Sequence, residues 1–180
     1  MPRITLPDGS ALEYDEPVAA LKVAEDIGPR LAKAALGCKI KGELSDLSAV
    51  IENDCELAIV TDKTRAGDQD PDGLYLIRHS TAHVMAEAIQ KIAPEAMLVY
   101  GPPLDNGFYY DIAFPEDRQL STNDFEAVEE EMARIIKEDR PFCRSELSPE
   151  EGMEKLKQEG SKFKIDNAER ALKQDPDAKI

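Results

Sequence analysis

The chain has 180 residues, of which 42% are hydrophobic and 33% charged, and its formal net charge is −15. No run approaches the roughly 18 apolar residues that a membrane span requires, and the N-terminus lacks the apolar core of a signal peptide. Nucleic-acid phosphates are bound by Lys and Arg, so a chain this acidic is not expected to bind DNA. RNA would have to bind through a local patch, or through parts of a larger protein outside this chain. Three distant cysteines, an odd number, favour a reducing, cytoplasmic setting.

The first 62 residues have the pattern of a compact α+β unit. Strands are predicted at residues 4–6, 11–14, 39–42 and 56–60. Apolar residues recur at three-residue steps over residues 18–27 and predict a helix, which Gly28 and Pro29 interrupt. The stripe of that helix comprises Val18, Leu21, Ala24 and Ile27. Two strands, a helix and two further strands predict a β-grasp domain.

Residues 63–73 are polar, contain two glycines and a proline, and predict a linker. A long helix is expected from about Leu74 to Ala93, where Pro94 ends it. Residues 97–114 predict a β-hairpin.

The turn of that hairpin is expected at Asn106-Gly107, the strongest turn signal in the chain. Ser121 with Asp124, and Ser148 before Pro149, are N-terminal capping patterns that predict two more helices. The first of these helices has an apolar stripe of Phe125, Val128, Met132, Ile135 and Ile136. Phe142 is expected to open a short strand, and the last twenty residues, polar and mixed, carry no predicted element.

The only two histidines, His79 and His83, lie four residues apart in the long helix and therefore face the same way. The apolar stripe of this helix comprises Ile77, Val84, Ala88 and Ile92. At about 100° per residue the histidines fall on roughly the opposite side, beside Ala86 and Gln90. One interpretation is an ordinary solvent-facing side. The other is a cleft-facing pair that binds a metal or activates water, with Ala82 and Ala86 leaving room for a substrate.

Other site classes find little support. A zinc protease requires Glu directly after the first histidine, where this chain has Ser80. Carboxylates such as Glu87 could add to the pair in principle, but no complete metal site is predicted, and His79 and His83 are at most partial ligands. The glycine loops that bind nucleotides and the nucleophile elbow of serine hydrolases are both missing from the sequence.

Two segments carry a resemblance to a known family. The segments HSTAH at 79–83 and GPPLDNGFYYD at 101–111 resemble the editing domain of bacterial threonyl-tRNA synthetases. Residues 4–10 and 51–54 are similar to a TGS domain, the β-grasp module that opens that enzyme. Alanyl-tRNA synthetases share the histidine motif, and stringent-response enzymes and some GTPases contain TGS domains, but the order of the two matches fits the threonyl family.

The resemblance covers nearly the whole chain and implies an α+β fold. It implies a TGS β-grasp domain at 1–62, a linker at 63–73 and a two-layer α+β editing domain at 74–180. In the family the editing pocket also contains a Cys-x-x-x-His pair. That pair has no counterpart here, so the editing domain is expected to be truncated at its C-terminal end.

The resemblance further implies roles for four residues. His79 and His83 would be catalytic, positioning a water molecule and moving a proton during hydrolysis of Ser-tRNA(Thr). Lys164 would be the family lysine that stabilises the oxyanion. Tyr110 would bind the substrate by orienting its amine or ribose.

The implied partners are tRNA(Thr) and mischarged Ser-tRNA(Thr), with neither DNA nor a membrane. The whole enzyme would be a homodimeric threonine–tRNA ligase, whereas a fragment of it could be a monomer. Its ATP and zinc would be bound in a catalytic domain that this chain lacks, so no cofactor is expected here. Two rival functions stay open: a non-catalytic tRNA- or ligand-binding module, which the missing Cys-x-x-x-His pair favours for the chain by itself, and a TGS module that binds a small ligand or a protein.

Overall fold

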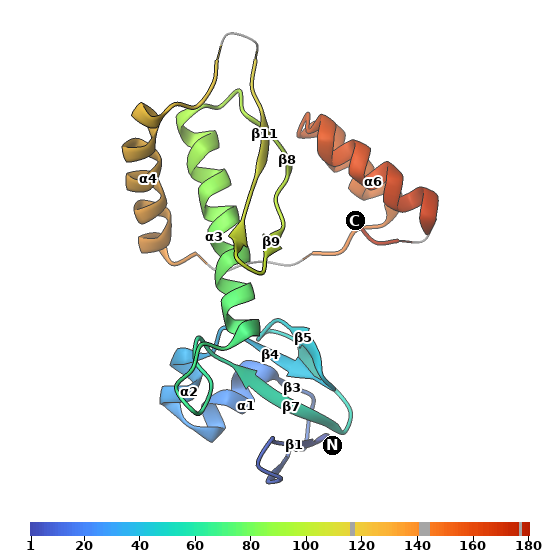
Figure 1. Ribbon diagram of the computed structural model, residues 1–180. Coiled ribbons are helices and arrows are strands. Elements are labelled where there is room, and N and C mark those ends of the chain that lie inside the picture. The colour runs from blue at the N-terminus through green and yellow to red at the C-terminus, as the bar shows by residue number, and fades with distance from the viewer. Residues whose placement is uncertain (116–117, 141–144, 177) are drawn as a thin grey trace. The chain divides into compact units, whose positions relative to one another are not determined.

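The computed structural model describes residues 1–115, 118–140, 145–176 and 178–180. The chain forms two compact units, Met1–His79 and Ser80–Ile180, and both combine helices with strands (Figure 1). The prediction of an α+β chain is therefore confirmed. Within the described ranges, no helix is both long enough and apolar enough to cross a membrane.

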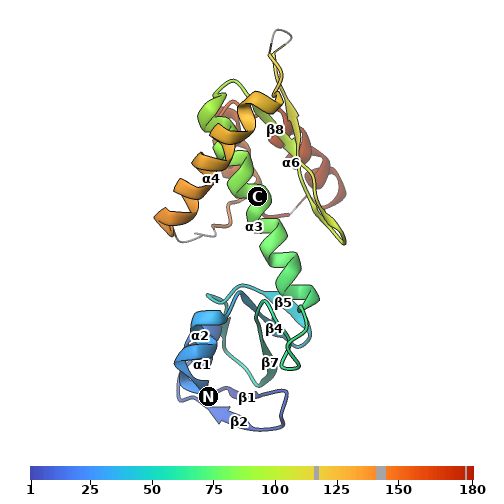
Figure 2. The same cartoon turned by 60° about the vertical axis from the view of Figure 1, so that its left-hand side comes forward.

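The first unit is built on a five-stranded sheet with the strand order β2-β1-β7-β4-β5 (Figure 2). Its strands are β1 (Arg3–Thr5), β2 (Ala11–Glu13), β4 (Gly37–Ile40), β5 (Glu43–Ser45) and β7 (Cys55–Val60). Strands β1 and β7 run parallel in the middle, and the other neighbours are antiparallel. A separate short pair joins β3 (Val18–Ala19) to β6 (Val50–Ile51). This topology confirms the predicted β-grasp unit.

Helix α1 (Ala20–Ile27) packs its buried residues Ala20 and Val23 against the sheet, and the short helix α2 (Pro29–Ala34) follows it. The predicted stripe was partly wrong. Val18 lies in strand β3, and the side chains of Leu21 and Ile27 are exposed. The reason is that the helix begins two residues later than the pattern suggested, because Val18 and Ala19 pair with β6.

Helix α3 (Pro71–Ile92) starts three residues before its predicted beginning. The carboxylate of Asp70 explains this, since Oδ1 accepts hydrogen bonds from the backbone N–H groups of Asp72 (2.9 Å) and Gly73 (3.0 Å). Gly73 lies against the backbone of Thr61, where an added Cβ atom would be 2.0 Å from the carbonyl oxygen. The residues just before α3 also fold back, with an isolated bridge between Lys63 and Gln69.

The second unit contains a long, irregular hairpin after α3. Strand β8 (Met97–Tyr100) pairs with β11 (Asp111–Ala113), and beyond them β9 (Pro103–Leu104) pairs with β10 (Gly107–Phe108). Leu104 is the register partner of Gly107, so the two connecting residues are Asp105 and Asn106. The hairpin is as predicted, but its turn lies one residue earlier than expected, because Gly107 belongs to the ladder.

Three helices complete this unit: α4 (Phe125–Glu138), which follows a short 3₁₀ turn, α5 (Pro149–Gln158) and α6 (Lys162–Gln174). Both predicted capping patterns are confirmed as reciprocal capping boxes, Ser121 with Asp124 and Ser148 with Glu151. Helix α6, which carried no prediction, packs against β8 and α5. The strand expected at Phe142 lies outside the described residues.

The core of the second unit lies around α3, which runs between α4 and the hairpin (Figures 1 and 2). Its buried residues are Ala88, Ile89, Ala93, Ala96, Val128 and Ile135. The predicted stripe of α4 is confirmed at Val128 and Ile135, but Phe125 and Ile136 are 55% and 65% exposed. The buried face of α4 is therefore narrower than its pattern of apolar residues.

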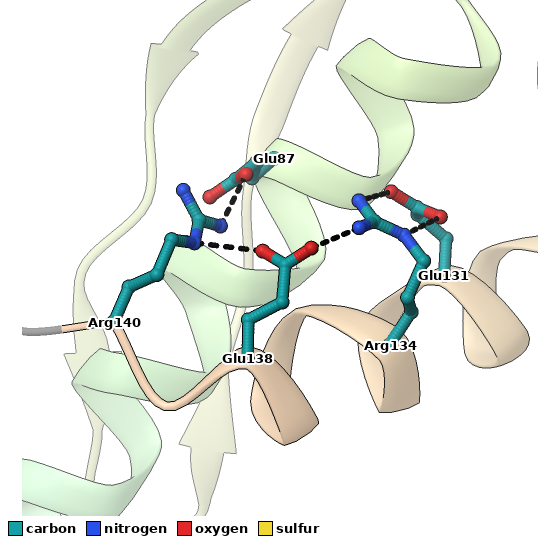
Figure 3. A network of polar contacts seen from close by, with 5 residues as sticks. All are labelled: Glu87, Glu131, Arg134, Glu138 and Arg140. Carbon is teal, nitrogen blue, oxygen red and sulfur yellow. Dashed lines mark hydrogen bonds and ion pairs between the residues drawn. The ribbon is translucent and has the colours of Figure 1, made fainter.

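Ion pairs join the surfaces of α3 and α4 (Figure 3). Arg140 lies 2.6 Å from Glu87 of α3 and 2.9 Å from Glu138 of α4. Arg134 pairs with Glu131 and Glu138 on its own helix. The side chains of both arginines are about half exposed, so solvent screens these contacts and each adds little to stability.

Candidate functional site

The two histidines lie one helical turn apart on α3. His79 is half-buried and His83 is exposed, so neither imidazole is enclosed in a core. The ring of Tyr75 meets the ring of His79 edge-on, with 6.0 Å between the ring centroids and 67° between the planes. This contact orients one face of the His79 imidazole.

The residues beside the histidines depart from the prediction in two respects. Ala82 and Ala86 are completely or almost completely buried, so they leave no open space for a substrate. Ile77, predicted as part of the apolar stripe, is 39% exposed. The buried face of α3 therefore includes Ala82 and Ala86 but not Ile77, because close packing accommodates small residues as well as large apolar ones.

Tyr110 belongs to the hairpin and is half-buried. Its ring lies against the backbone of Gly101, where an added Cβ atom would come within 2.4 Å of Tyr110 Cδ2. Only glycine leaves space for the ring at this place. Burial raises the pKa of the Tyr110 phenol, so the hydroxyl stays protonated at neutral pH and can donate a hydrogen bond.

Lys164 lies in the first turn of α6, and its side chain is 52% exposed. Its Nζ is 3.7 Å from a carboxylate oxygen of Glu159, a loose ion pair that costs little to break. Lys164 lines a pocket of about 360 Å³ together with Gln90 of α3 and with Ser161 and Lys162.

Gln90 relates this pocket to the histidine side of α3. It stands seven residues after His83, which is about two helical turns and roughly 10 Å along the axis. Its side-chain Nε2 donates to the carbonyl oxygen of Ala96 at 3.2 Å, which fixes the amide at the edge of the pocket. The lining of the pocket includes neither His83 nor Tyr110.

The predicted site residues therefore lie on three elements of the chain. His79 and His83 are neighbours on α3, Tyr110 is fixed in the hairpin, and Lys164 borders a separate pocket. Sequence reasoning missed Gln90 and Lys162 in the lining of that pocket. Two signals could have indicated these residues. Gln90 stands seven residues after His83, and Lys162 and Lys164 flank an aromatic residue.

Two histidines alone do not form a metal site. Within the part of the chain that the structure describes, no group of three or more His, Cys, Asp or Glu side chains is placed to hold a metal ion. The chemistry that the two imidazoles can supply by themselves is proton transfer and the orientation of a water molecule.

Comparisons with known proteins agree with the fold. Residues 2–61 match the family model of the TGS domain. Over 166 residues, 92% of this chain, the sequence is 48% identical to the threonine–tRNA ligases of Burkholderia multivorans, Paraburkholderia phytofirmans and Paraburkholderia xenovorans. The match covers 25% of each ligase, so the chain spans about a quarter of the length of these relatives. Over 92% of its length the chain is thus similar to the N-terminal region of bacterial threonine–tRNA ligases, and its first unit matches the TGS domain.

Proposed function

We propose that this chain acts on tRNA within a threonine–tRNA ligase, by hydrolysing serine from mischarged Ser-tRNA(Thr). The observation that carries the proposal is the pair of accessible imidazoles, His79 and His83, one turn apart on α3. The 48% identity to threonine–tRNA ligases supports the choice of tRNA(Thr) as the partner and of a cytoplasmic setting.

The need for such a reaction follows from the chemistry of the two amino acids. Serine lacks only the methyl group of threonine, and a difference of one methyl or methylene group is worth about 1–3 kcal/mol, or 10–200-fold, in binding. A ligase that selects threonine by binding alone would therefore attach serine too often. A second, hydrolytic site removes the error after it has been made.

In the proposed reaction, water attacks the carbonyl carbon of the ester that joins serine to the terminal ribose of the tRNA. One imidazole accepts the proton of the attacking water, and the second holds the water in line. The tetrahedral intermediate then expels the ribose oxygen, which takes up the proton from the imidazolium. Serine and tRNA with a free terminal hydroxyl are released.

Lys164 and Tyr110 are proposed to assist this reaction. The Lys164 ammonium would leave its loose contact with Glu159 and stabilise the negative oxygen of the intermediate. The protonated hydroxyl of Tyr110 would donate a hydrogen bond to the substrate amine or ribose. The glycine beneath its ring supports this role, because it sets the position of the phenol in the absence of substrate.

We propose no cofactor for this step. ATP and zinc would act in the ligation reaction, in a part of the relatives that the match does not include, and a homodimer would be the assembly of the whole ligase. A second function, in which the chain binds tRNA without hydrolysing it, is favoured by one observation: the pocket lined by Lys162 and Lys164 is not lined by the histidines.

Hydrolysis of Ser-tRNA(Thr) by this chain, with Thr-tRNA(Thr) as the control substrate, tests the proposal. We expect selective release of serine, and a loss of at least about tenfold in rate for His79→Ala and for His83→Ala, as for removal of a general base. Lys91→Ala is the matched control, because Lys91 is an exposed residue of the same helix, and it should leave the rate unchanged.

Binding of tRNA is measured beside hydrolysis, by fluorescence anisotropy at several salt concentrations. Salt-dependent binding without release of serine would support the non-catalytic function instead. Neither binding nor release would refute both proposals for this chain.

A further inference from the structure

The first unit has a cavity of about 350 Å³ that the proposed editing reaction does not use. It lies where two turns flank the sheet, the turn after β1 with Pro7 and the turn after β4 with Gly42. Its floor consists of residues from three adjacent strands, Thr5 of β1, Glu56 of β7 and Lys39 of β4. This volume is toward the lower end of the range of small-molecule sites.

The floor belongs to the face of the sheet that turns away from the buried core. Along β7, Cys55 and Leu57 are core residues, so Glu56 and Ala58 point to the opposite face. Thr5 is the register partner of Glu56 and Lys39 that of Ala58, which places these side chains on the same face. The cavity is therefore lined by side chains that the sheet itself aligns.

The start of α3 covers the neighbouring part of this face. Leu76 contacts the backbone at Gly37, where an added Cβ atom would be 2.7 Å from Cδ1 of the leucine. Asp72 forms an ion pair with Lys39. The ammonium of Lys39 is thus held at the border of the cavity, and it has three protons to donate, of which a single carboxylate does not use all.

The lining of the cavity includes one acidic and one basic side chain, and the two differ in whether they already have a partner. Among the residues that the structure describes, the carboxylate of Glu56 has no ion-pair or hydrogen-bond partner. The side chain of Lys39, by contrast, is 35% exposed and already oriented by Asp72. The hydroxyl of Thr5 stands beside Glu56 on the next strand. Glu56 and Thr5 can therefore accept hydrogen bonds from a cation, and Lys39 can donate to an anion.

We propose that this cavity binds a free α-amino acid. The ammonium group of the ligand would contact Glu56 and Thr5, its carboxylate would contact Lys39, and a short side chain would lie against Pro7 and the neighbouring Leu6. A zwitterion is the ligand class that satisfies both charges at once, whereas a simple amine or a simple carboxylate satisfies only one. This inference goes beyond the proposed editing reaction and does not depend on His79 or His83.

Calorimetric titration of the whole chain tests the proposal. The probes are L-threonine and L-alanine as zwitterions, ethylamine as an amine, and propionate as a carboxylate. We expect saturable millimolar binding of at least one zwitterion, and at least tenfold weaker binding of ethylamine and of propionate. Binding of ethylamine as tight as that of the amino acids would overturn the zwitterion assignment, as would absence of any saturable binding up to about 20 mM.

Three variants place the binding in the cavity. Glu56→Gln keeps the shape of the side chain and removes its charge, and it should weaken binding at least tenfold. Glu43→Gln, an exposed change on edge strand β5 outside the cavity lining, is the matched control and should leave binding unchanged. His79→Ala should also leave it unchanged. Loss of binding in His79→Ala but not in Glu56→Gln would assign the amino acid to the histidine site and refute the cavity.

Discussion

Gly101 and Tyr110 are predicted to be energetically coupled. In Gly101→Ala, the new methyl group would lie 2.4, 2.6 and 2.8 Å from three carbon atoms of the Tyr110 ring. Real Cβ contacts are much longer, so the ring or the strand must move. Overpacking of this kind costs about 1–3 kcal/mol. In a unit of roughly 100 residues, a loss of 1 kcal/mol lowers the melting temperature by about 4–8 °C.

The assay is a double-mutant cycle followed by differential scanning calorimetry. Tyr110→Ala removes the ring, so adding Gly101→Ala to it should cost much less than in the wild-type background, with a coupling energy of about 1–3 kcal/mol. Gly107→Ala is the control, because nothing lies within 4 Å of a Cβ atom built there. An equal cost of Gly101→Ala in both backgrounds would show that the contact with the ring is not the cause.

Three further predictions concern a helix start, a thiol and the surface ion pairs. Asp70→Ala should destabilise the chain by about 1 kcal/mol, measured by thermal unfolding, because it removes the cap of α3, while Asp70→Asn should retain most of the stability. Burial raises the pKa of the Cys38 thiol from 9.0 to about 11, so the folded state holds its proton more tightly than the unfolded state. The contribution of Cys38 to stability should therefore be complete below pH 9 and decline between pH 9 and about 11, and Cys38→Ala should flatten this decline in urea titrations at each pH. Arg140→Ala should leave the urea midpoint of unfolding almost unchanged, since solvent screens its half-exposed ion pairs with Glu87 and Glu138. A clear drop in the midpoint would mean that the arginine also supports the packing of α4.

Local signals predicted much of the fold. Both helix starts were indicated by local pattern, Ser121 with an acid three residues later and Ser148 before a proline, because the reciprocal hydrogen bonds of a capping box involve only neighbouring residues. The β-grasp unit was indicated by the order of its strands and helix. Helix α6 was not predicted, because its apolar stripe is short and its stability comes from packing against β8 and α5.

Long-range contacts account for what the sequence did not indicate. The prediction that the helix begins at Val18 was wrong because Val18 pairs with β6, more than thirty residues away, and therefore belongs to a strand. The burial of Ala82 and Ala86 could not be inferred from their size, since an alanine fits a crowded surface as well as an open one. The pocket beside Lys164 is lined by residues from α6 and from the end of α3, and the spacing of residues along the chain does not show that these two segments lie together.

The central position of β1 has a consequence for synthesis of the protein. Strand β1 lies between β2 and β7, so its second edge stays unpaired until Cys55–Val60 has left the ribosome. At about 5–20 residues per second, the exposed β1–β2 ribbon waits for several seconds before its parallel neighbour arrives. An open strand edge invites pairing with other chains. The nascent first unit is therefore most vulnerable to aggregation during this interval, and a slowing of translation between β2 and β7 would prolong it.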